Sequence, residues 1–197
     1  MATSALDIIH KLGGTISTSQ ALKSGVHPRD LYKLRDDGSL VALSRGVYRI
    51  AEIGFTANPD LVAVACRAPD AVICLVSALS YHNLTTQIPY EISVAVAYGA
   101  SVPTIDYPPV KVHRFKGEAF GAGIEEHALD GTYIRVYDQE KTLADCFKFR
   151  GQLGMEIVLE ALKLYWERQK PDLGKLLKYA KVCRIEKTFT PYLESRL

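Results

Sequence analysis

The stretch that decides the fold is ISTSQALKSGVHPRDLYKLRDDGSLVALSRGVYRI, residues 16–50. Its first ten residues predict a short helix, because Ser17 or Thr18 can accept hydrogen bonds from the first free N–H groups and Gly25 can end the helix. A second helix is expected over residues 28–37, since it would begin with a proline, which suits the first helical position. Two short helices joined by so tight a turn are typical of a helix-turn-helix.

The second helix and the hairpin expected after it, over residues 40–50, carry cations that suit contact with duplex DNA. Leu31 and Leu34 fall on one side of the helix, which leaves its other faces to charged and aromatic residues. The hairpin has Arg45 at its tip and so predicts a basic wing. We expect the following DNA contacts: Arg29, Tyr32, Lys33 and Arg35 on the helix, Ser44, Arg45 and Arg49 in the hairpin, and Ser17 and Thr18 at the start of the first helix.

These contacts would have different roles. Arg29 is the best candidate for a base edge, because arginine can hold guanine through two hydrogen bonds in the major groove, and Tyr32 and Lys33 come next. Arg45 would reach phosphates or the minor groove. The alternative is a winged domain that binds protein, since a fold can persist after its DNA contacts are lost. Three carboxylates that interrupt the positive face keep this alternative open: Asp30, Asp36 and Asp37.

The length of 197 residues favours two domains, because the opening unit uses only a small part of the chain. We expect a winged helix-turn-helix domain over residues 1–52, which includes a first helix near residues 5–11, and a second domain over residues 57–197. The second domain should begin with a helix at 59–67 and continue with mixed strands. The predicted fold class is therefore α+β, an N-terminal winged helix-turn-helix followed by a mixed α/β domain that ends in helices.

The expected strands of the second domain cover residues 71–75, 91–97, 110–115 and 133–137, with a helix between the first two that Ser77 would cap. Helices are expected over 139–150, where Asp138 is the cap, over about 155–166, and behind Pro171. In the first of these, Lys141 and Asp145 are spaced to pair weakly on a helix surface. Tyr81 is expected to pack its helix against the sheet, and the favoured role of His82 is to satisfy a backbone carbonyl rather than to bind a partner.

Charge is distributed unevenly along the chain. Residues 148–197 hold eleven Lys and Arg against six Asp and Glu, whereas residues 57–147 hold six against eleven. The C-terminal helices therefore offer a basic surface for nucleic acid or for an acidic protein partner, unless they are simply a solvated face. Three lysines at helical spacing mark the expected partner surface: Lys175, Lys178 and Lys181.

Composition favours a cytoplasmic protein without a membrane segment, because the longest apolar runs are much shorter than a bilayer span. The four cysteines form no C-x-x-C pair, which argues against a zinc site and favours reduced, buried thiols. No metal or other cofactor is expected, and no recognisable catalytic motif is present, so we expect no enzymatic activity. The alternative is a DNA-directed nuclease or modification subunit. Asp70 and the run Gln139-Glu140-Lys141 imitate a metal nuclease, but a glutamine stands where that motif needs an acid.

Three segments resemble the AbiEi family of antitoxins: the N-terminal unit ending in Ser44-Arg-Gly-Val-Tyr-Arg-Ile50, residues 77–84 followed by residues 91–95, and Val136-Tyr-Asp-Gln-Glu-Lys-Thr-Leu-Ala-Asp145. They occur in the family's order and the likeness extends over about residues 5–185. The resemblance implies a transcriptional repressor that binds inverted repeats in its own promoter through the winged helix. It also implies an antitoxin that counteracts a nucleotidyltransferase-type toxin, directly or through a shared target, in a type IV toxin–antitoxin system of abortive phage infection.

Overall fold

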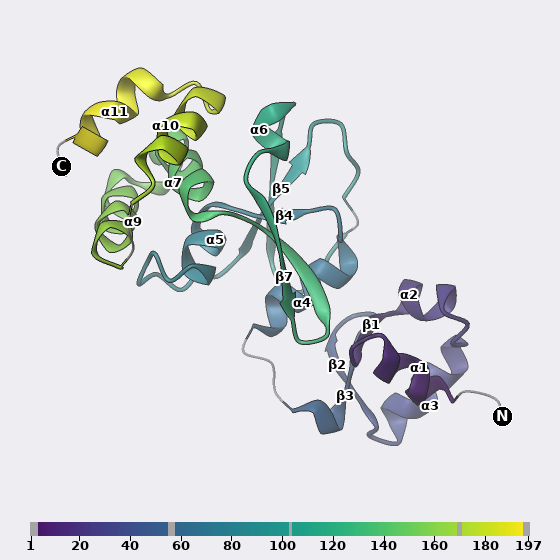
Figure 1. Cartoon of the computed structure of the whole chain (residues 1–197). Coiled ribbons are helices and arrows are strands. Elements are labelled where there is room, and N and C mark those ends of the chain that lie inside the picture. Colours follow the sequence, from purple (N-terminus) through teal and green to yellow (C-terminus); the bar gives the residue numbers. More distant parts are fainter. Residues whose placement is uncertain (1–3, 55–57, 103, 169–170, 195–197) are drawn as a thin grey trace. The chain divides into compact units, whose positions relative to one another are not determined.

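A computed structural model of the chain describes residues 4–54, 58–102, 104–168 and 171–194 (Figure 1). The chain divides into two compact units, and both are built from more than one segment. The first unit comprises Met1–Ala71, Val102–Val110 and Glu126–Arg135. The second comprises Val72–Ser101, Lys111–Glu125 and Val136–Leu197. The unit that contains the winged helix is thus larger than the domain expected from the sequence.

The first unit contains the predicted winged helix-turn-helix. Its elements, in chain order, are α1 (Ala5–Lys11), β1 (Thr15–Ser17), α2 (Thr18–Lys23), α3 (Pro28–Asp36), β2 (Leu40–Ser44) and β3 (Val47–Ile50). The hairpin β2–β3 confirms the predicted wing, and β1, which the sequence did not predict, pairs antiparallel with β3 to complete a three-stranded sheet. Because β1 takes the residues before Thr18, α2 is shorter than expected.

Local signals fix the ends of these helices. Ser17 caps α2 in a capping box with Gln20, and Pro28 stands in the first turn of α3. The sheet and the three helices enclose one apolar core. Its fully or nearly fully buried members are Ile9, Ile16, Ala21, Val26, Leu31, Leu40, Tyr48 and Ile50. Leu31 therefore ties α3 to the core and fixes which face of that helix remains exposed.

The helix α4 (Pro59–Arg67) extends the first unit beyond the winged helix. It has the predicted bounds and follows a short 3-10 helix at Ala51–Ile53. Val62 and Cys66 of α4 pack with Val47 of the wing in a second small core. This packing is the physical reason that the first unit does not end at residue 52.

A five-stranded sheet has the order β6-β5-β4-β8-β7, with β4 antiparallel to β5 and parallel to β8. The strands are β4 (Val72–Ile73), β5 (Ile92–Ala97), β6 (Val110–Phe115), β7 (Ile124–Leu129) and β8 (Thr132–Tyr137). The residues of β6, β7 and β8 are each divided between the two units. The strand β7 was not predicted, and the strand expected at 71–75 is shorter because α5 (Leu75–Tyr81) begins there. Ser77 is consequently not a cap, and its hydroxyl instead accepts from the backbone N–H of Ser93 at 2.9 Å.

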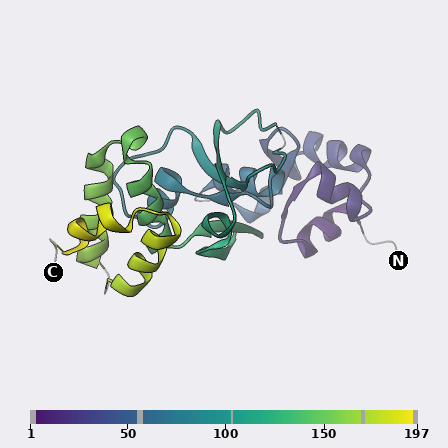
Figure 2. The same ribbon diagram turned by 90° about the horizontal axis from the view of Figure 1, so that it is seen from above.

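The second unit ends in helices, as predicted. They are α7 (Gln139–Lys148), α8 (Arg150–Leu153), α9 (Met155–Arg168), α10 (Leu173–Val182) and α11 (Glu186–Glu194), preceded by the single turn α6 (Glu118–Gly121). The green to yellow helices lie together in both views (Figures 1 and 2). The helix α7 contacts α5, α9 and α10, and every residue from Lys141 to Phe147 is buried. Among the described residues, none of the helices has the length and apolar character of a bilayer span.

Candidate nucleic-acid interface

The exposed side of α3 is the first part of the candidate interface. His27 precedes the helix, and its ring Nδ1 accepts from the backbone N–H of Arg29 at 3.2 Å, which satisfies one free donor of the first turn. With Leu31 buried in the core, Arg29, Tyr32 and Lys33 are all exposed. The helix therefore presents two cations and an aromatic ring to solvent, as the sequence predicted.

Arg35 differs from the other helix cations because its charge is already paired. Its guanidinium donates to the Asp36 carboxylate from Nη2 at 2.7 Å and from Nε at 2.9 Å. The guanidinium carbon also lies 5.1 Å from the centre of the Tyr32 ring. Both side chains of the ion pair are exposed to solvent. A DNA phosphate would therefore have to displace the Asp36 carboxylate in order to bind the Arg35 guanidinium. Arg35 is thus a weaker candidate contact than Arg29 or Lys33.

The wing tip is the second part of the candidate interface. The side chain of Arg45 is 88% exposed and forms an ion pair, at 3.2 Å, with Asp106 of the first unit. Gly46 has a φ of 75°, which suits glycine, and its carbonyl accepts from the backbone N–H of Thr18 at 2.8 Å. The Thr18 hydroxyl donates to the same carbonyl at 3.3 Å. Thr18 therefore holds the wing turn to α2, and its predicted role as a phosphate donor needs correction.

Two serines expected at the interface face inward. Ser17 is 2% exposed, and its hydroxyl accepts from the backbone N–H of Gln20 at 3.3 Å as the cap of α2. The hydroxyl oxygen of Ser44 is buried and has no hydrogen-bond partner in the described part of the chain. Neither hydroxyl is available to a phosphate in this structure. The Ser17 hydroxyl is used as the cap of α2, and the Ser44 hydroxyl is buried in the hairpin.

The expectation for Arg49 also needs correction. This residue is 2% exposed, and its guanidinium donates to the carbonyls of Gly54 at 3.2 Å and Asp130 at 3.1 Å. It also donates to the Thr15 hydroxyl at 3.3 Å and lies 3.5 Å from the Asp130 carboxylate. All these partners belong to the first unit. Arg49 is therefore an internal connector of that unit rather than a contact to the DNA backbone.

Sequence reasoning missed Arg67 near the wing. A side chain at Gly46 would meet the Arg67 guanidinium at 3.4 Å, and that guanidinium donates to the carbonyl of Thr104 at 2.9 Å. Arg67 thus adds a cation beside the wing turn. The sequence could not show this, because no local pattern indicates that Arg67, at the end of α4, lies beside the turn of the β2–β3 hairpin.

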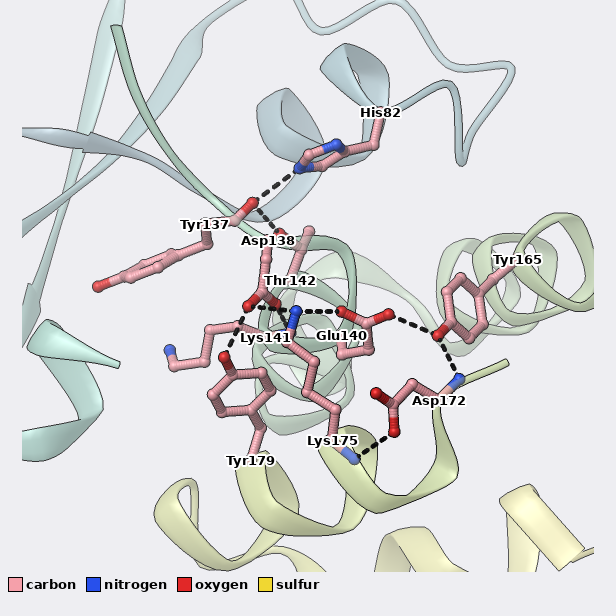
Figure 3. A network of polar contacts seen from close by, with 10 residues as sticks. All are labelled: His82, Tyr137, Asp138, Glu140, Lys141, Thr142, Tyr165, Asp172, Lys175 and Tyr179. Atoms are coloured by element: carbon pink, nitrogen blue, oxygen red, sulfur yellow. Dashed lines mark hydrogen bonds and ion pairs between the residues drawn. The ribbon is translucent and has the colours of Figure 1, made fainter. Parts of the chain in front are cut away.

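The second unit contains a polar network in which Lys175 takes part (Figure 3). The Lys175 ammonium lies 3.1 Å from both the Asp138 and the Glu140 carboxylates. Burial lowers the pKa of this lysine, but the bonds to the two carboxylates outweigh burial and raise it. Lys175 is thus paired within the molecule, which corrects the expectation that it extends freely toward a partner.

Two phenols complete this network (Figure 3). Tyr179 donates to Asp138 at 2.6 Å, and Tyr165 donates to Glu140 at 2.6 Å. Burial and then the hydrogen bond to a carboxylate raise the pKa of both phenols well above the ordinary range. Asp138 also accepts from the backbone N–H of Lys141 at 2.7 Å, which confirms it as the cap of α7. The network therefore ties α7 to α9 and α10.

The pair Lys141 and Asp145 is buried, so the prediction of a weak surface pair was wrong. Both side chains are 0% exposed and form an ion pair, and the Cys183 thiol donates to the second oxygen of Asp145 at 3.2 Å. Burial raises the pKa of Asp145 despite the neighbouring ammonium. The aliphatic part of Lys141 packs beside Gly123, where an added Cβ would lie 2.7 Å from it. This pair thus belongs to the core.

The interpretation of His82 is confirmed. Its Nε2 lies 2.7 Å from the carbonyl oxygen of Tyr137, at the junction of β8 and α7 (Figure 3). Tyr81 is partly buried, with its ring in edge contact with the His82 ring. The four cysteines are buried as predicted. The motif that imitates a nuclease is not assembled, since Lys141 faces Asp145 and Glu140 faces Lys175 and Tyr165.

These features define a winged helix-turn-helix protein with a second α/β unit that ends in helices. Residues 4–51 match the family model described as "Transcriptional regulator, AbiEi antitoxin", so the winged-helix part of the chain is similar to that family. The fold is also similar to the crystal structure of the RV2827C protein from Mycobacterium tuberculosis, with a TM-score of 0.56 and 15% identity over 92% of this chain and 72% of that chain. At this identity the likeness concerns the fold alone. No curated protein sequence matches the chain.

Proposed function

We propose that this protein is a DNA-binding transcriptional repressor and antitoxin that regulates its own operon. The observation that carries the proposal is the exposure of Arg29 and Lys33 on α3 together with Arg45 at the wing tip, within a winged helix of an antitoxin regulator family. Helices of this kind read base edges in the major groove, and the wing adds contacts to the backbone or the minor groove. The expected target is duplex DNA with inverted repeats in the promoter.

Arg29 and Arg45 have separate roles in this proposal. Arg29 lies in the first turn of α3, the part of a recognition helix that contacts base edges, so it contributes to sequence preference. Arg45 projects from a turn with an almost fully exposed side chain and contacts phosphates, which are the same in every sequence. Tyr32 and Lys33 support the contact of α3 with the groove.

A gel-shift titration with the duplex upstream of the reading frame, at two salt concentrations, tests these roles. Arg29→Ala is expected to cost about 1–3 kcal/mol and to relax base preference. Arg45→Ala should weaken all sequences alike and lower the salt slope by about 0.9. Lys163→Ala, on the exposed side of α9, is the matched control and should bind as the parent does. Unchanged binding by both arginine variants would contradict the assignment.

The antitoxin role is the second part of the proposal. We infer that the protein counteracts a nucleotidyltransferase-type toxin by binding, without catalysis or a cofactor, in a type IV system that serves abortive phage infection. The family match over the first unit and the basic surface of α10 support this inference. Lys178 and Lys181 are exposed on that surface, whereas Lys175 is paired internally.

Co-expression with a nucleotidyltransferase-type toxin, which this proposal expects in a neighbouring reading frame, tests the antitoxin role. The full chain is expected to restore growth that the toxin arrests, and a form with an inactive winged helix should still restore it when both genes are driven by foreign promoters. Co-purification of the two proteins would indicate direct binding, and rescue without co-purification would indicate a shared target. Failure to restore growth would contradict the antitoxin role.

A further inference from the structure

The second unit contains a large basic groove that the DNA-binding role of the winged helix does not use, and its lining includes Lys178 and Lys181 of the α10 surface described above. Its volume is about 1200 Å³, which exceeds the roughly 300–1000 Å³ of ordinary small-molecule pockets. Six cationic side chains line it, and all are exposed: Arg114, Lys116, Lys148, Lys178, Lys181 and Arg184. Glu118 is the single carboxylate among the described lining residues. The groove therefore carries a strong excess of positive charge.

Most of this charge is not neutralised within the molecule. In the described part of the chain, only Lys181 of the six cations forms an ion pair, at 3.5 Å with the exposed carboxylate of Glu186. Lys178 and Lys181 are three residues apart on α10 and so lie on one face of that helix. Cations placed close together without counter-charges repel one another, and a bound polyanion would relieve this repulsion.

Three aromatic side chains line the groove with the cations: Tyr98, Phe149 and the buried Phe115. Tyr98 follows β5 and is 65% exposed, while its backbone N–H donates to the carbonyl of Phe115 at 2.7 Å. The ammonium of Lys116 lies 4.1 Å from the centre of the Tyr98 ring. Phe149 is partly buried and packs against Phe115, with ring centres 5.8 Å apart. The groove thus has one outward-facing ring, that of Tyr98, whose backbone is fixed by a hydrogen bond, and two inner rings that pack against each other.

We propose that this groove binds single-stranded nucleic acid. Proteins that hold unpaired strands combine a basic groove that follows the phosphates with aromatic rings on which bases stack. Here the six cations would contact phosphates, and Tyr98 would stack with a base, with the ammonium of Lys116 near both. An acidic peptide would satisfy the cations but would bring no base to stack on the exposed ring, and a duplex keeps its bases stacked and unavailable. This binding does not depend on the repressor function.

Fluorescence anisotropy with the full chain and labelled oligo(U) and oligo(dT) of about eight nucleotides, within the size of one such site, tests the proposal. Either strand should bind, and the ratio of their affinities shows whether RNA or DNA is preferred. The double variant Lys178→Gln/Arg184→Gln should lower the salt slope by about 1.4, since each cation contributes about 0.7 for single strands. Lys163→Gln, an exposed α9 cation outside the groove, should change nothing.

Substitution of Tyr98 separates stacking from simple attraction between charges. Tyr98→Leu is expected to weaken binding by about five-fold or more, whereas Tyr98→Phe keeps a ring and should stay within about two-fold of the parent. The exposure of Tyr98 means that folding should not suffer, and equal unfolding midpoints would verify this. Unrelated duplex and poly-L-glutamate serve as competitors. The proposal is overturned if neither strand binds, if either competitor displaces the strand as well as unlabelled strand does, or if Tyr98→Leu binds like the parent.

Discussion

Replacing Arg49 tests whether this arginine supports the fold of the first unit or contacts DNA. In Arg49→Ala, the carbonyls of Gly54 and Asp130, whose hydrogen bonds are partly buried, both lose a charged donor, at 3.2 and 3.1 Å. A buried acceptor left without its donor costs about 1–3 kcal/mol. We take the lower half of this range, because the bonds are of ordinary length and the Asp130 side chain, 24% exposed, can reach water. The free energy of unfolding should therefore fall by about 2–4 kcal/mol.

Urea unfolding followed by circular dichroism measures this loss. Arg45→Ala is the matched control, because its side chain is 88% exposed and its removal should change stability by no more than about 0.5 kcal/mol. Arg49→Lys adds a second comparison, since lysine keeps the charge but lacks the planar fork that reaches several acceptors at once. It should lose stability while it keeps DNA affinity. The reasoning is refuted if Arg49→Ala is as stable as the parent and loses DNA affinity as Arg45→Ala does.

Three further predictions concern the second unit and the thiols. Asp145→Ala should cost about 3–5 kcal/mol in urea unfolding, because it leaves the Lys141 ammonium buried without its partner, and the double variant Lys141→Met/Asp145→Leu should recover most of the loss. Equal stability of the single and double variants would argue against a buried pair. The thiols should resist Ellman's reagent at about pH 8 until urea is added, because burial raises their pKa, for Cys183 to about 12; rapid reaction in the native protein would contradict this. The residues are Cys66, Cys74, Cys146 and Cys183. Burial and the bond to Asp138 raise the pKa of Tyr179 above its ordinary value of 10.0, so its contribution to stability is present below that pH and declines as the pH rises further. When the pH is raised from about 8 to about 10.5, the free energy of unfolding of Tyr179→Phe should fall by less than that of the parent. An equal fall in both proteins would contradict a contribution of Tyr179 ionisation to stability.

Local signals were sufficient for the helices and the hairpin of the winged helix, but not for β1. Pro28 at the start of α3, Leu31 on its inner face and Gly46 in the wing turn each act through near neighbours in the chain. The sequence could not show that Arg49 points inward, since its partner Asp130 comes from a distant segment. A strand residue reveals only which face it occupies, not what covers that face.

Burial of charge was the main feature that the sequence did not reveal. The spacing of Lys141 and Asp145 was recognised, but the helices that enclose α7 are set by tertiary packing. Lysine and aspartate side chains are mostly exposed in proteins, so a pair on the helix surface was the reasonable expectation. The basic groove was foreseen only as an excess of positive charge near the C-terminus. Its remaining cations, such as Arg114 and Lys148, come from separate elements that only the fold brings together.

The central claim is that α3 and the wing recognise the protein's own promoter. DNase I footprinting of the full chain on the upstream duplex, in the presence of excess unrelated duplex, tests this claim most directly. The account predicts protection confined to inverted repeats, which shifts or disappears with Arg29→Ala. Protection spread evenly along the duplex, or none at concentrations at which the protein is folded, would contradict it.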